Sequence, residues 1–132
     1  MSYRTSKELT ELFSESRVFV NLDRPFGQGE RPLTLAFSEA LSAGLPVVAR
    51  DLQGLDYKNF IDCNGVCTND FDAMCSFIGK CLTDRDYAHK CGTRSRQIAL
   101  QTFSHDALRP KYEEVIRRAQ VTFEKKKSTK RS

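Results

Sequence analysis

The chain has 132 residues, of which 39% are hydrophobic and 29% are charged. This length is typical of one globular domain, and no stretch has the ~20 consecutive apolar residues that a membrane span requires. The first residues lack the apolar core of a signal peptide. We therefore expect a cytoplasmic protein.

The formal net charge of +4 comes from the C-terminal tail. Residues 124–132 contain five Lys and Arg residues against one Glu, so residues 1–123 are neutral overall. We expect one domain over residues 1–123 that does not bind nucleic acid, followed by a basic, disordered tail over residues 124–132. The alternative for this tail is weak contact with anionic lipid head groups, which would make the protein peripheral at the membrane.

Five cysteines are an odd number for a disulfide framework, and no Cys-x-x-Cys pair is present. This usage predicts buried free thiols in a reducing compartment and no metal site, with a disulfide or a metal site as the alternative.

The first half of the chain alternates helix and strand patterns. Thr5 and Glu8 form a capping-box pattern that predicts a helix to about residue 16. A β-branched and aromatic strand over 18–22, a loop over 23–31, a helix from Pro32 to a cap at Gly44 and a strand over 46–49 follow.

The second half continues with a short turn and helix over 54–61 and a third strand over 65–68. Asn69 or Asp70 then caps a helix to about residue 82, Thr83 or Asp84 caps another to about residue 100, and Ser104 caps a last, long one. The apolar stripe of this last helix consists of Leu108, Tyr112, Val115, Ile116 and Ala119.

Alternating helices and near-continuously apolar strands predict an α/β fold, in which helices cover both faces of a parallel sheet. Only three strands are readable, and a sheet of three strands leaves long edges. We therefore expect an incomplete fold, whose open edge is covered by missing sequence, by a partner or by a second copy.

The loop after the first strand contains Gly27 and Gly29, with Arg24 and Arg31 nearby, and leads into a helix. Glycines let the backbone approach a ligand, and a helix N-terminus favours an anion such as phosphate. An ordinary surface turn has the same composition. Glu39 in the following helix is either solvated or accepts hydrogen bonds from a ribose diol.

Residues 39–49, Glu-Ala-Leu-Ser-Ala-Gly-Leu-Pro-Val-Val-Ala, resemble the Glu-Ala-Met-Ala-x-Gly-x-Pro-Val-Val-Ala segment of family 4 (group 1) retaining glycosyltransferases. Residues 25–27, Pro-Phe-Gly, resemble the donor loop of that family, and residues 62–66 resemble its Asp-Gly-x-Asn-Gly turn. Phe103 and Ser104 resemble its closing Phe-Ser-Trp segment. The resemblance covers residues 8 to 119.

This resemblance implies the C-terminal, Rossmann-like half of a GT-B enzyme, which binds a nucleotide-sugar as its substrate and needs no metal or other cofactor. A hexosyltransferase-like activity would require a separate N-terminal acceptor domain or a partner chain.

The resemblance also implies site residues. In the family, the second Glu of a Glu-x7-Glu pattern binds the nucleotide ribose, which corresponds here to Glu39. The first Glu contacts the transferred sugar, but Arg31 stands eight residues before Glu39, so Glu30 becomes the candidate catalytic residue. The other donor-binding candidates are Phe26, Gly27, Gly29, Arg31, Leu33 and Thr34.

Two alternatives stay open at this point. One is a non-catalytic scaffold or nucleotide-binding module that kept the fold, which the departure at the first Glu favours. The other is a nucleotide-sugar epimerase of the same architecture.

Overall fold

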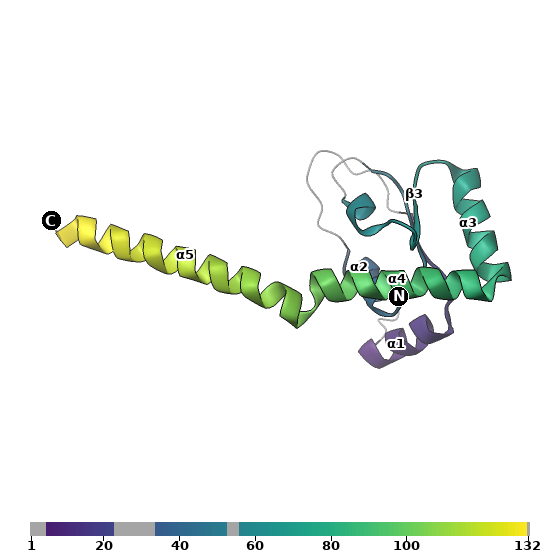
Figure 1. Cartoon of the computed structure of the whole chain (residues 1–132), viewed down its shortest axis with the longest axis horizontal. Coiled ribbons are helices and arrows are strands. Elements are labelled where there is room, and N and C mark those ends of the chain that lie inside the picture. Colours follow the sequence, from purple (N-terminus) through teal and green to yellow (C-terminus); the bar gives the residue numbers. More distant parts are fainter. Residues whose placement is uncertain (1–4, 23–33, 53–55, 132) are drawn as a thin grey trace. The chain divides into compact units, whose positions relative to one another are not determined.

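The computed structural model describes residues 5–22, 34–52 and 56–131, which form two compact units, Met1–Ala99 and Leu100–Ser132. The described elements are α1 (Ser6–Glu15), β1 (Phe19–Asn21), α2 (Leu35–Ser42), β2 (Val47–Ala49), the 3-10 helix η1 (Tyr57–Phe60), β3 (Gly65–Cys67), α3 (Phe71–Thr83), α4 (Arg85–Phe103) and α5 (His105–Arg131) (Figure 1).

The described strands form one parallel sheet in the order β1-β2-β3. Val47 at the start of β2 pairs with Phe19 on one side and with Gly65 on the other. All three residues of β2 are buried, as expected for the central strand of a covered parallel sheet. The predicted α/β fold with parallel strands is therefore confirmed.

Helix starts follow the predicted caps. The Thr5 side chain and Glu8 form the complete capping box of α1, and the Asp70 side chain accepts hydrogen bonds from two backbone amides of α3. Asp84 accepts from the Tyr87 amide at 2.9 Å, and Ser104 accepts from the Ala107 amide at 3.2 Å. The sequence left two candidate caps for α3 and two for α4. In both helices the aspartate, Asp70 or Asp84, is the capping residue.

Helix α2 differs from the prediction at its start. Its N-cap is Thr34 and its first residue is Leu35, whereas the predicted opening at Pro32 lies outside the described residues. Phe37, Ala40 and Leu41 form its buried face. Phe37 packs against Phe19 of β1 and against Tyr57 of η1, with ring centroids 6.4 and 4.7 Å apart.

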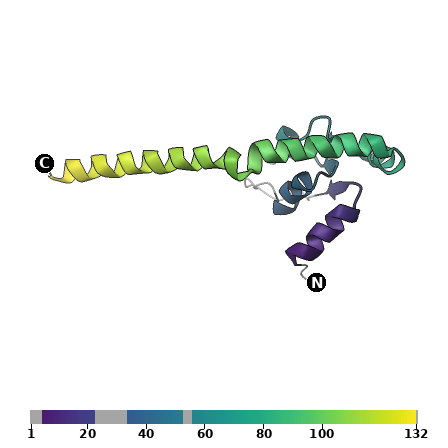
Figure 2. The ribbon, with the colours of Figure 1, turned by 60° about the horizontal axis from the view of Figure 1, so that its bottom comes forward.

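Helix α4 lies beside α2 (Figures 1 and 2). Arg96 Nη1 donates a 2.9 Å hydrogen bond to the Ser42 carbonyl oxygen in the last turn of α2. Gly44 follows with φ of 76°, the left-handed conformation that glycine favours, and it contacts Gly92 of α4. The predicted glycine cap of this helix is thus confirmed.

The second unit consists mostly of α5, which continues to Arg131. The sequence predicts a disordered tail from residue 124, but the structure shows helix there. Glu and Lys have high helix propensity, and neither Pro nor Gly follows Pro110. The two compact units divide after Ala99, and the predicted domain boundary after residue 123 stays a prediction.

None of the helices in the described ranges is both long and apolar enough to cross a membrane.

Candidate functional site

The carboxyl end of β1 is held by a buried polar contact. Asn21, the last residue of β1, donates from Nδ2 to the Tyr57 hydroxyl at 2.9 Å and to Thr34 Oγ1 at 3.4 Å. These bonds join the end of β1, the start of α2 and η1. Sequence reasoning did not single out Asn21 or Tyr57. The one feature of the sequence that could have indicated this contact is an amide side chain, Asn21, at the end of an apolar strand.

Thr34, a predicted donor-binding residue, lies at this edge as the N-cap of α2. Its side chain makes no capping hydrogen bond to the helix and instead accepts the bond from Asn21. The first turn of any helix has N–H groups without an intrahelical partner. The Phe37 amide donates to the Thr34 carbonyl at 3.1 Å, whereas the Leu35 and Ala36 amides have no hydrogen-bond acceptor among the described residues. These two amides can therefore receive an anionic ligand.

Glu39, the predicted ribose-binding residue, lies five residues after Thr34, or ~7 Å further along the helix axis. It is partly buried. Its carboxylate has no hydrogen-bond or ion-pair partner among the described residues, while its backbone carbonyl accepts a hydrogen bond from the Ala43 amide. A partly buried carboxylate with free acceptor oxygens can receive hydrogen bonds from a hydroxyl-rich ligand.

The remaining predicted site residues belong to the loop after β1, which lies outside the described residues. They are the candidate catalytic residue Glu30 and the donor-binding candidates Phe26, Gly27, Gly29, Arg31 and Leu33.

The chain segments that leave β2 and β3 are joined at the same edge. The Thr68 amide donates to the Ala49 carbonyl at 3.1 Å, and Asn69 Nδ2 donates to the Asp51 carbonyl at 2.8 Å. The Cys67 thiol contacts the Arg50 carbonyl at 3.7 Å, and its pKa is raised by burial and, secondarily, by the nearby Asp51 charge. At the carboxyl edge, the segments that follow β2 and β3 are therefore held together, while the end of β1 is joined to α2 and η1.

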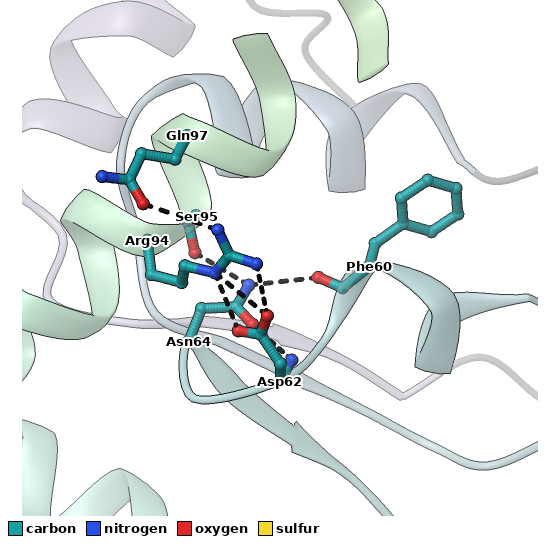
Figure 3. A network of polar contacts seen from close by, with 6 residues as sticks. All are labelled: Phe60, Asp62, Asn64, Arg94, Ser95 and Gln97. Atoms are coloured by element: carbon teal, nitrogen blue, oxygen red, sulfur yellow. Dashed lines mark hydrogen bonds and ion pairs between the residues drawn. The ribbon is translucent and has the colours of Figure 1, made fainter. Parts of the chain in front are cut away.

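The motif at residues 62–66 has a structural role at the opposite edge, before β3 (Figure 3). Asn64 is fully buried, and its Oδ1 accepts from the Asp62 amide at 2.7 Å. Its Nδ2 donates to the Phe60 carbonyl and to Ser95 Oγ, both at 3.1 Å. Outside this buried network, Arg94 of α4 binds the Asp62 carboxylate through two nitrogens.

The structure confirms free thiols at all five cysteines. Cys81 and Cys91 are buried, but Cys63 and Cys75 are exposed, so the expected burial is wrong for those two. Burial raises the pKa of the Cys81 thiol to about 11. The described residues include no group of three or more His, Cys, Asp or Glu side chains that could hold a metal ion.

No family model matches the chain, and no curated protein or solved structure resembles it at a significant level.

Proposed function

We propose that the chain binds a nucleotide-sugar at the carboxyl edge of its sheet, as the Rossmann-like donor-binding part of a GT-B glycosyltransferase. The observation that supports this most directly is Glu39. It combines partial burial with carboxylate oxygens that have no partner among the described residues, and it begins the segment that resembles family 4 glycosyltransferases. In open α/β sheets, ligands bind beyond the carboxyl ends of the strands.

Each part of such a donor would have a partner at this edge. The Leu35 and Ala36 amides at the start of α2 suit the diphosphate, because the helix N-terminus has a positive dipole end. Glu39 would accept hydrogen bonds from the ribose hydroxyls. Glu30 is the proposed contact to the transferred sugar.

The proposed reaction is retaining transfer of the sugar to an acceptor. As the bond between the sugar and the diphosphate breaks, negative charge grows on the leaving phosphate. The α2 amides would stabilise that charge through fixed dipoles that need no reorganisation. The acceptor would be held by an N-terminal domain or a partner chain.

Calorimetric titration of the full chain with UDP, GDP, ADP and their sugars tests the proposal. We expect one nucleotide to bind selectively and Glu39→Gln to weaken that binding about tenfold, because a hydrogen bond to a charged group contributes ~1.5 to 3 kcal/mol. Glu11→Gln on the exposed surface of α1 is the matched control and should leave affinity unchanged.

A correctly folded chain that binds none of these ligands would reject the proposed donor site. Equal weakening by Glu39→Gln and Glu11→Gln would reject the role of Glu39. Tight nucleotide binding without transfer after addition of an acceptor domain would indicate a non-catalytic module, and release of an altered free sugar would indicate an epimerase.

A further inference from the structure

Helix α5 has an apolar face that its own unit does not bury. Tyr112, Val115, Ile116 and Phe123 are 57 to 69% exposed. With Leu108 and Ala119 they recur every three or four residues, so all six lie along one side of the helix, which we call the α5 stripe. Contiguous exposed apolar patches mark interaction surfaces.

The unit that contains the α5 stripe is strongly basic. Residues 100–132 contain nine Lys and Arg residues and four Asp and Glu residues, a net charge of +5, whereas residues 1–99 have a net charge of −1. Ion pairs already occupy two of the acidic side chains: Arg109 pairs with Glu113, and Glu114 pairs with Arg117 and Arg118.

The excess of basic residues lies next to the C-terminal end of the α5 stripe. Phe123 lines a shallow depression of about 670 Å³ together with Lys125, Lys126, Lys127 and Thr129. Lys126 follows Phe123 by three residues, so it lies on the same side of the helix as the stripe. An aromatic ring beside three ammonium groups matches the boundary between phospholipid acyl chains and anionic head groups.

A second copy of α5 fits this face less well. The stripe spans residues 108 to 123, about two heptads, while a coiled coil is indicated by three or four. In a coiled coil of two α5 helices, Lys126 would lie on the contact line between the helices and bring like charges together. Nucleic acid would use the basic charge but leave the apolar stripe without a role.

We propose that α5 is a membrane-surface helix that lies in the plane of an anionic phospholipid bilayer. The stripe enters the boundary between head groups and acyl chains, and the lysines after Phe123 contact lipid phosphates. The surface potential of an anionic leaflet attracts such a segment, and each basic residue near the surface adds to the affinity. This function is independent of the proposed nucleotide site.

Co-sedimentation of the full chain with vesicles tests the proposal. One set of vesicles is phosphatidylcholine alone, and the other contains roughly one third phosphatidylserine, the kind of lipid that gives a leaflet its negative surface potential. We expect binding to the anionic vesicles only, with an affinity that falls as salt is raised.

Two variants separate the two parts of the interaction. Phe123→Glu removes apolar area from the stripe, and the triple change of Lys125, Lys126 and Lys127 to Gln removes charge; each should lower affinity about tenfold or more. The control is Val121→Glu, which introduces the same charge on the opposite side of α5, at a side chain that is 40% exposed. It should reduce binding much less than Phe123→Glu.

The proposal is overturned if the chain fails to sediment with anionic vesicles, or if Phe123→Glu and Val121→Glu bind equally. It is also overturned if sedimentation equilibrium shows a dimer that Phe123→Glu dissociates while vesicle binding is unchanged, since the stripe would then be an interface between copies. All of these side chains are exposed, so circular dichroism should show the same fold in every variant.

Discussion

Gly92 of α4 lies directly against Gly44, the residue that follows α2: a Cβ atom at Gly92 would stand 2.1 Å from the Gly44 carbonyl oxygen. Real Cβ atoms do not approach a carbonyl oxygen so closely. The contact therefore requires glycine at position 92, and it lets α4 pack against the turn between α2 and the buried strand β2.

We expect Gly92→Ala to lower the free energy of unfolding by ~2 to 3 kcal/mol, because the new methyl group forces two backbone segments apart. Gly79→Ala in α3 is the matched control, since a Cβ atom there would meet no heavy atom within 4 Å. In a helix interior this change should raise stability by ~0.5 to 1 kcal/mol. Urea denaturation followed by circular dichroism measures both, and equal effects would contradict the close contact.

The buried Asn64 should be the most sensitive polar residue of the first unit. Asn64→Ala removes three hydrogen bonds, to Asp62, Phe60 and Ser95, and leaves buried groups unpaired, which should cost ~2 to 3 kcal/mol. Because Ser95 is a direct partner, the double variant with Ser95→Ala should cost less than the two single changes added together.

The control for this set of Asn64 and Ser95 variants is Asn59→Ala, at an exposed position of η1. Its denaturation curve should overlay that of the unchanged chain. Strict additivity of Asn64→Ala and Ser95→Ala would show that the two side chains do not interact.

The pair of Asp62 and Arg94 predicts a pH dependence. The Arg94 guanidinium, bound at 2.6 Å, lowers the pKa of the Asp62 carboxyl in the folded state. A lowered folded-state pKa gives stability that is fully present above the ordinary Asp pKa of ~4 and is lost as pH falls through the folded-state value.

Asp62→Asn should therefore lower the melting temperature at pH 7, and its effect should shrink towards pH 2, as the unchanged carboxyl takes up its proton. The effect at pH 7 should be small and should shrink with salt, because both side chains are partly exposed to solvent. Glu11→Gln should give the same melting temperature as the unchanged chain at both pH values. A loss as large at pH 2 as at pH 7 would contradict an electrostatic contribution of the pair.

Four of the five cysteines should fall into two reactivity classes towards a maleimide at pH 7.5, while Cys67 has intermediate exposure. Cys63 and Cys75 are exposed and should react within minutes. Cys81 and Cys91 are buried, and burial raises the pKa of both thiols, so little reactive thiolate is present and access is blocked. Mass spectrometry of tryptic peptides over time distinguishes the classes. If all of these cysteines of the native chain were labelled as fast as in urea, the burial of Cys81 and Cys91 would be contradicted.

Local sequence signals determined much of the fold. Capping side chains such as Thr5 and Asp70 place helix starts through bonds to amides two or three residues away, so sequence spacing alone predicts them. Apolar runs separated by helices likewise predict parallel strands, because a parallel pair needs a long crossover. The α/β fold and Gly44 as the α2 cap follow from such short-range rules.

Sequence alone also selected Glu39 and Thr34, but it could not show their surroundings. The bonds from Asn21 to Thr34 and Tyr57 span 13 and 36 residues, and no periodicity predicts which side chains meet over such separations. In the same way, Asn64 was assigned only to a turn that resembles a family motif, whereas its bond to Ser95, 31 residues away, gives it a structural role.

For residues 124–131 of α5, composition alone predicted the wrong conformation. Its composition predicts disorder because the segment lacks apolar residues to bury in a core, yet its Lys and Glu residues are good helix formers, and the helix begun at His105 continues through them. Composition therefore determined the charge of this segment. Only the structure shows that this segment continues the preceding helix. That continuity makes residues 124–131 helical and places Lys126 on the same side of the helix as the α5 stripe.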